Sequence, residues 1–191
     1  MSPVIQGDGS RPLRADARRN RDALLTAAAA VFAESGADAP LDDVARRAGV
    51  GNATLYRHFP TRRELLVAVY ADEVEALCAL GRALLQSERP ADALFEWLAA
   101  FAAHVAARRE LATSVPDDPA RSALFDGWHA AMHETAAVLL ARAGQEMSPD
   151  VTAADLLTLA AGIALTGPAD ARAERLLRLV RQGATGFRTR G

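Results

Sequence analysis

Residues 52–59 carry side chains that could recognise the edges of base pairs. Leu55 and Phe59 are four residues apart and share one face of a helix, so the opposite face is polar and available for contact. That face combines a small residue, a hydroxyl, a phenol and a guanidinium: Ala53, Thr54, Tyr56 and Arg57. A small residue lets a backbone approach closely, a hydroxyl can bond base edges, and an arginine can bind both acceptors of a guanine. The set suits a major groove and is poor material for a hydrophobic core.

Two short helices joined by a glycine turn would position this face. In the first, over residues 41–48, apolar side chains recur at i, i+3, i+4 and i+7: Leu41, Val44, Ala45 and Ala48. Gly49 follows at the place where a residue in the left-handed conformation ends a helix. A short helix, a glycine-bearing turn and a second helix with an outward polar face are typical of a helix-turn-helix. A solvated helical hairpin inside a bundle is the alternative.

The preceding residues predict a helix over 17–35 that braces the pair. Its apolar stripe consists of Leu24, Ala27, Ala28, Val31 and Phe32. A two-turn helix is not stable alone in water, so we expect this stripe to pack on Val44, Leu55 and Phe59. Residues 1–14 carry Gly, Pro, Ser and charge without periodicity, which predicts a disordered arm. The arm either lies along DNA phosphates or enters the adjacent minor groove, or it is a solvated tail.

The rest of the chain predicts five further helices. Pro60 stops the second short helix, Thr61 and Glu64 form a capping box, and a long helix follows over residues 62–85. The other helices are expected over 91–107, 120–145, 152–165 and 170–183, and the run TSVPDDP is expected to be a loop. The fold class is therefore all-α. Its expected parts are a disordered arm (1–14), a helix-turn-helix domain (15–60) and a larger helical domain (61–191).

The first part of the chain resembles the amino-terminal DNA-binding domain of TetR-family transcriptional regulators. The similarity covers residues 17–70 and is carried by the run from Phe32 to Gly36, by LDDVARRAGV and by TLYRHFPTRRELL. It implies that the second short helix meets DNA and that the start of the next helix holds phosphate. The expected DNA-binding residues are Asn52, Ala53, Thr54, Tyr56, Arg57, His58, Thr61 and Arg62. Many members carry a hydroxyl residue where this chain has Pro40 or Gly51.

Two of the later helices carry most of the aromatic side chains of the second half. A ligand pocket is mostly apolar with a few placed polar groups, and the resemblance implies that the second domain binds an effector. The residues expected to line a pocket are Tyr70, Trp97, Phe101, His104, Phe125, Trp128, His129 and Met132. An ordinary helical core would show the same aromatic spacing, and that alternative stays open.

Metal and catalytic chemistry find little support in the sequence. His129 and His133 are four residues apart and could chelate one ion, but the metalloprotease pattern needs a glutamate where Ala130 stands. We expect no metal, no cofactor and no enzyme, because the sequence has no phosphate loop, nucleophile elbow or candidate triad. Cys78 is the single cysteine. We expect it to be a buried structural thiol, with a redox sensor as the alternative.

Charge is divided unevenly along the 191 residues. Residues 1–63 carry ten arginines and seven acids, a net +3, whereas residues 64–191 carry twelve arginines and seventeen acids, a net −5. The basic part contains residues 52–59, whose polar face is expected to contact DNA. No stretch reaches the roughly 18 consecutive apolar residues of a membrane span, and the first residues lack the apolar core of a signal peptide. We therefore expect a soluble, cytoplasmic protein.

The last two predicted helices could pair with their copies in a homodimer, as in the family, although a monomer could also fold them onto its own core. A dimer would read both halves of a near-palindromic operator in double-stranded DNA. The resemblance implies repression that ends when a small, largely apolar effector binds, with the long helix near Tyr70, Val74 and Cys78 transmitting the change. A regulator without a ligand, which responds to a protein partner or acts constitutively, is the other hypothesis.

Overall fold

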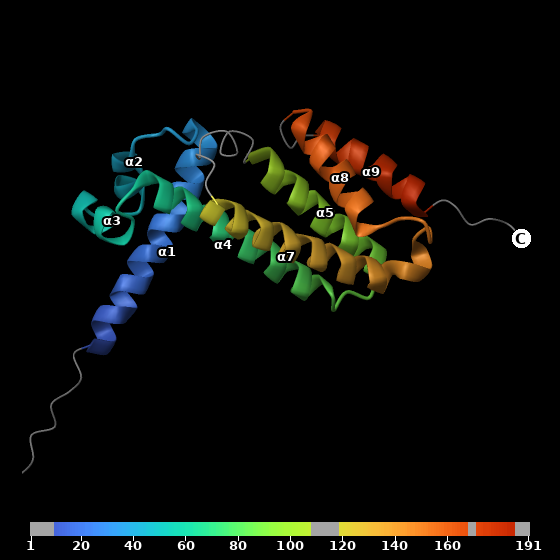
Figure 1. Ribbon diagram of the computed structural model, residues 1–191, viewed down its shortest axis with the longest axis horizontal. Helices are drawn as coiled ribbons and strands as arrows, with labels where there is room; N and C mark the ends of the chain where they lie inside the picture. Colours follow the sequence, from blue (N-terminus) through green and yellow to red (C-terminus); the bar gives the residue numbers. More distant parts are fainter. Residues whose placement is uncertain (1–9, 108–118, 168–170, 186–191) are drawn as a thin grey trace, which may run out of the picture. The chain divides into compact units, whose positions relative to one another are not determined.

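The computed structural model describes residues 10–107, 119–167 and 171–185. This part of the chain is all-α, as predicted, and contains no strand. Its helices are α1 (Ser10–Ser35), α2 (Leu41–Arg47), α3 (Asn52–His58), α4 (Arg62–Leu84), α5 (Pro90–Ala107), α7 (Pro119–Ala143), the short 3₁₀ helix η1 (Gly144–Glu146), α8 (Ala153–Leu165) and α9 (Ala171–Thr185) (Figure 1). The expected loop over TSVPDDP falls, apart from its last residue, outside the described residues.

The chain divides into two compact units, Met1–Tyr70 and Ala71–Gly191. The division falls inside α4, which is one continuous helix. Among the described residues, no helix is long and apolar enough to cross a membrane.

The first unit is built on the long helix α1, which packs against α2, and α2 packs against α3. The predicted stripe of α1 is buried, with Leu24 and Ala28 completely inaccessible. Val44, Leu55 and Phe59 are buried as well, between 0% and 4% exposed. The predicted core of this unit is confirmed, and the two short helices gain rigidity from tertiary packing that they could not supply alone.

The start of α1 differs from the expected boundary. The helix begins at Ser10, seven residues before Ala17, so residues 10–14 are helical where we expected a disordered arm. Arginine, alanine and leucine favour helices. Pro12 lies in the first turn, where its missing N–H would have had no partner within the helix. Residues 1–9, the rest of the expected arm, lie outside the described residues.

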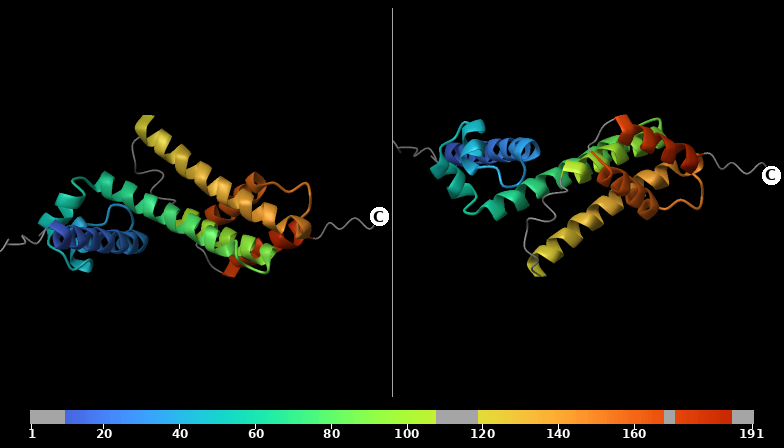
Figure 2. Two further views of the ribbon diagram at one scale, coloured as in Figure 1. Left: turned by 90° about the horizontal axis from the view of Figure 1, so that it is seen from below. Right: turned by 90° about the horizontal axis from the view of Figure 1, so that it is seen from above.

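The second unit is organised around α5, which packs against α7, α8 and α9 (Figure 2). Leu94, Trp97 and Leu98 of α5 are fully buried. The Trp97 indole Nε1 donates a hydrogen bond to the carbonyl oxygen of Leu77 on α4, at 2.9 Å. This bond satisfies the one polar group of a buried tryptophan and joins α5 to the backbone of α4.

Gly81 of α4 lies close to side chains of α5 and α7. A Cβ atom at this position would lie 2.2 Å from Cγ2 of Thr135 on α7 and 3.2 Å from Nε1 of Trp97 on α5. A glycine inside a helix is unfavourable by about 1 kcal/mol relative to alanine. The crowding by Thr135 and Trp97 explains why a glycine occupies this position inside a helix.

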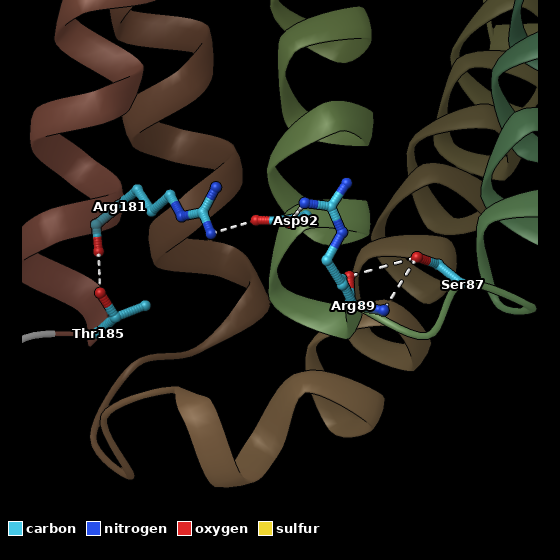
Figure 3. A network of polar contacts seen from close by, with 5 residues as sticks. All are labelled: Ser87, Arg89, Asp92, Arg181 and Thr185. Atoms are coloured by element: carbon cyan, nitrogen blue, oxygen red, sulfur yellow. Dashed lines mark hydrogen bonds and ion pairs between the residues drawn. The ribbon is translucent and has the colours of Figure 1, made fainter.

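Polar contacts hold α9 against the start of α5 (Figure 3). The Arg181 guanidinium donates a hydrogen bond to Asp92 Oδ1 and lies over the ring of Phe95, 5.7 Å from its centroid. Arg89 Nη1 lies 2.9 Å from the other carboxylate oxygen of Asp92. The hydrogen bond from Arg181 lowers the pKa of Asp92, so this carboxylate stays ionised between two arginines.

Candidate functional site

The turn between α2 and α3 forms as the sequence predicts. Gly49 has a φ of +70°, and its N–H donates to the carbonyl oxygen of Arg46 at 3.1 Å. The N–H of Val50 donates to the carbonyl oxygen of Ala45 at 3.0 Å. These two bonds make a Schellman motif, which ends α2 and sets the direction of the chain into α3.

A side-chain hydrogen bond fixes the beginning of α3. Gly51 is its N-cap residue and has no side chain with which to accept an N–H. Instead, Asn52 Nδ2 donates to Oδ1 of Asp42 on α2, at 2.8 Å. This link joins the two short helices at the end where α3 starts, so Asn52 holds α3 in position in addition to lying on its exposed side.

The polar face of α3 is exposed, and its apolar face is buried. Leu55 is 1% exposed, whereas Ala53, Tyr56 and Arg57 are exposed and Thr54 is half-buried. Tyr56, at 48%, is one of the most exposed large apolar side chains in the described chain. The structure thus brings a phenol, a guanidinium and a hydroxyl together on one accessible surface of a rigid helix, with a small residue between them.

Three further residues of the predicted set lie at the end of α3 and the start of α4. The His58 ring Nε2 is buried and has no hydrogen-bond partner among the described residues. Thr61 Oγ1 accepts a hydrogen bond from the backbone N–H of Glu64 at 3.2 Å, so Thr61 caps α4 as predicted. Arg62 Nη1 donates to the carbonyl oxygens of Ala37 and Ala39, each at 2.7 Å.

Other arginines of the first unit bind its own acids. Arg47 of α2 donates to Glu34 of α1 at 2.6 Å, and this hydrogen bond lowers the pKa of Glu34. Arg46 pairs with Asp43 at 2.7 Å within α2. Both pairs are largely exposed, so they contribute little to stability.

Five of the eight residues predicted to line a pocket are large apolar side chains of α5 and α7. Trp97, Phe101 and Met132 are buried, and the rings of Trp97 and Phe101 stack with centroids 5.8 Å apart. Phe125 and Trp128 are half-buried and form an edge-to-face pair at 5.2 Å.

His129 is exposed, and its Nδ1 lies 2.7 Å from the carbonyl oxygen of Phe125, one turn earlier on α7. Tyr70 is the last residue of the first unit, whereas the other seven belong to the second unit.

His104 is the polar group of this set that lies in the interior. Its side chain is 8% exposed, and its Nδ1 lies 3.4 Å from Oε2 of Glu73 on α4. A neighbouring carboxylate favours the charged imidazole, but burial outweighs it and lowers the pKa of His104. The imidazole is therefore neutral near pH 7 and can offer either a donor or an acceptor.

The remaining candidates for chemistry are spread over the surface or buried separately. His133 is exposed on α7, and Cys78 is a buried free thiol. Within the described ranges, no group of three or more His, Cys, Asp or Glu residues is placed to hold a metal ion.

Two family models match this sequence. The model described as bacterial regulatory proteins, tetR family, matches residues 24–69. The model described as transcriptional regulator SbtR-like, C-terminal domain, matches residues 89–185. Together they span both structural units.

Solved structures and curated proteins agree with these models. A TetR transcriptional regulator from Streptomyces coelicolor is 37% identical, with a TM-score of 0.74 over 86% of this chain and 98% of that one. A TetR regulator from Mycobacterium vanbaalenii is 35% identical, with a TM-score of 0.70 over 91% and 99%.

Two curated relatives match over a shorter region. TtgW of Pseudomonas putida is an uncharacterized regulator, 39% identical over 69 residues (36% of this chain and 52% of TtgW). FasR of Mycolicibacterium smegmatis is a transcriptional activator, 37% identical over 82 residues (42% and 37%). The match therefore spans about half of TtgW and about a third of FasR.

Proposed function

This chain belongs to the TetR family of DNA-binding transcriptional regulators, and we propose that it represses transcription as a homodimer. In this proposal the dimer binds a near-palindromic operator and is released by a small, largely apolar effector. The observation that best supports DNA binding is the exposed polar face of α3. The opposite face of this helix is held in the core by Leu55, which is 1% exposed. A reporter gene placed behind the operator tests the direction of control, because FasR shows that a relative can activate.

We propose that the DNA-binding surface consists of the exposed face of α3, within a DNA-binding domain over residues 15–60, and of the start of α4, which follows that domain directly. Arg57 is assigned to a guanine, Thr54 and Tyr56 to base edges or phosphates, and Ala53 to close backbone approach. Asn52 and Thr61 lie at the two helix starts, where backbone N–H groups attract phosphate.

Selection of bound sequences from random duplex DNA tests the assignment of Arg57. Arg57→Ala should lose discrimination at one symmetric pair of positions, at a cost of about 1–3 kcal/mol for each base contact. Arg82→Ala is the matched control, because it removes an exposed arginine from the second unit. Uniform weakening on all sequences would make Arg57 a phosphate contact instead.

We infer that α8 and α9 form the dimer interface. Leu159 and Leu165 of α8 and Leu179 of α9 are 49%, 57% and 56% exposed in the single chain. Exposed apolar side chains on two helices in contact can form an interaction surface when a second chain covers them. Two copies related by a twofold axis would place their α3 helices in successive major grooves, about 34–36 Å apart.

Sedimentation velocity distinguishes this interface from others. Leu165→Arg should convert a dimer into a monomer at micromolar concentration, because it places a charge within an apolar interface. Leu124→Arg on α7 is the control, since Leu124 is also exposed, at 49%, but lies outside α8 and α9. A dimer that persists in Leu165→Arg, or that dissociates in Leu124→Arg, would contradict the assignment.

We propose that the effector binds in the larger helical domain expected from the sequence, residues 61–191, among the apolar side chains of α5 and α7. Phe101, Met132 and the pair Phe125 and Trp128 would contact it, and His104 would supply the single polar anchor. A chemically varied compound set should contain at least one member that raises the melting temperature in a concentration-dependent way and releases the operator. If no compound raises it, control by a protein partner or constitutive binding becomes the better hypothesis.

A further inference from the structure

Arg62 opens α4, where the family resemblance predicts a contact with DNA phosphate. In the structure, its Nη1 atom faces the protein and donates to the carbonyl oxygens of Ala37 and Ala39, at 2.7 Å each. These acceptors lie 25 and 23 residues earlier in the chain, in the connection between α1 and α2. Both hydrogens of this nitrogen are therefore used within the protein.

The connection that Arg62 holds also makes a backbone hydrogen bond of its own. Gly36 leaves α1 with a φ of +81°, and the N–H of Ala39 donates to the Gly36 carbonyl oxygen at 3.2 Å. Ala37 and Ala39 are 5% and 4% exposed, so their carbonyl oxygens need partners close to the buried backbone. Pro40, the N-cap residue of α2, has no hydroxyl with which to cap that helix.

We propose that Arg62 is a positioning residue for the helix-turn-helix formed by α2 and α3 rather than a phosphate contact. Its two charge-assisted hydrogen bonds fasten the α1–α2 connection to the start of α4. Because α2 follows this connection directly and binds α3 through Asp42 and Asn52, the position of α3 depends on the guanidinium of Arg62. The inference rests on the proposed DNA-binding surface, and it changes the role of one residue within it.

The experiment compares Arg62→Gln with Arg46→Gln in the full-length protein. Both variants remove one arginine charge from the first unit, but within the described part of the chain the side chain of Arg46 pairs with Asp43 of its own helix. Three quantities are measured: the melting temperature, the operator affinity at a temperature where circular dichroism shows each variant fully folded, and the dependence of that affinity on salt concentration.

We expect Arg62→Gln to lower the melting temperature by about 3–8 °C relative to Arg46→Gln, because two charge-assisted hydrogen bonds are lost. The fully folded variant should bind the operator on the order of tenfold more weakly than Arg46→Gln. Without the two hydrogen bonds the α1–α2 connection is less well fixed, and the exposed side chains of α3 are no longer held in position to contact DNA. Its salt slope should equal that of Arg46→Gln.

Two results would overturn the proposal. One is an unchanged melting temperature together with a salt slope lower by about two units per dimer, which is the loss of one phosphate contact per protomer. The other is a lower melting temperature with unchanged affinity of the folded variant, which would make Arg62 a structural residue only. Absence of operator binding by the unsubstituted protein would refute the proposed function. The melting temperature of Arg62→Gln would still test whether Arg62 stabilises the α1–α2 connection.

If Arg62→Gln does not fold, Arg62→Lys takes its place, because lysine keeps one donor nitrogen. Faster hydrogen exchange at the Ala39 amide than in the unsubstituted protein, combined with weaker operator binding, supports the positioning role. Exchange at the unsubstituted rate overturns it.

Discussion

Gly81→Ala should destabilise the protein although alanine is the better helix former. The new Cβ would lie 2.2 Å from Thr135 Cγ2 and 3.2 Å from Trp97 Nε1. Thr135 cannot simply turn away, because its hydroxyl donates to the carbonyl oxygen of Ala131 at 2.8 Å, and breaking that bond costs about 1 kcal/mol. Overpacking a core costs about 1–3 kcal/mol, against a gain of about 1 kcal/mol in helix propensity.

With the Thr135 hydrogen bond lost as well, the net expectation is a loss of about 1–3 kcal/mol in the free energy of unfolding, measured by urea denaturation. Thr135→Ser removes the clashing methyl group and keeps the hydroxyl. The double variant Gly81→Ala with Thr135→Ser should therefore be more stable than Gly81→Ala alone. This rescue identifies the contact, because a general loss of stability would not be reversed by shortening Thr135.

Gly127→Ala is the matched control. Gly127 is exposed on α7, and no described atom outside its own helix backbone and chain neighbours lies within 4 Å of a Cβ built there. Alanine should raise the free energy of unfolding by about 0.5–1 kcal/mol. The reasoning is refuted if Gly81→Ala is as stable as the unsubstituted protein, or if the two glycine substitutions act alike.

Three other perturbations have defined outcomes. Burial lowers the pKa of His104 below its ordinary value of 6.5, so the unfolded chain takes up a proton first as pH falls. The free energy of unfolding should decrease below about pH 6.5, and His104→Gln should flatten this decrease in urea titrations between pH 7.5 and 5.5. Thr152→Ala removes the capping box that Thr152 forms with Asp155 at the start of α8 and should lower the free energy of unfolding by about 1 kcal/mol in urea. Asp92→Arg should lower the melting temperature through repulsion from Arg181, and adding Arg181→Asp should restore it.

Local patterns in the sequence were enough to predict the helices and the reading face. Gly49 ends α2 with a positive φ because only glycine adopts that conformation cheaply. The four-residue spacing of Leu55 and Phe59 places both in the core, and the exposure of Tyr56 and Arg57 then follows from the geometry of a helix. Each of these predictions depends on residues within about ten positions of one another.

Contacts between distant residues could not be predicted in this way. Arg62 finds its carbonyl partners more than twenty positions earlier, and a basic residue at a helix start resembles a phosphate ligand whichever partner it has. The crowding of Gly81 by Thr135, on another helix, is equally invisible in the sequence. The exposure of Leu159, Leu165 and Leu179 in the single chain is a third feature that depends on tertiary packing, and the proposed partner chain would cover these side chains.

This difference separates two kinds of mutation within the DNA-binding surface. Side chains on the outer face of α3, such as Arg57, are exposed, so substituting them should change operator preference with little effect on stability. Arg62 binds the backbone that supports α3, so its substitution should change stability and affinity together without changing which bases are preferred. In a plot of operator specificity against melting temperature, substitutions on the outer face of α3 should therefore change specificity at constant melting temperature. Substitutions of Arg62 should change melting temperature at constant specificity. If Arg57 variants instead change the melting temperature and leave specificity unchanged, the outer face of α3 is itself part of the structural support.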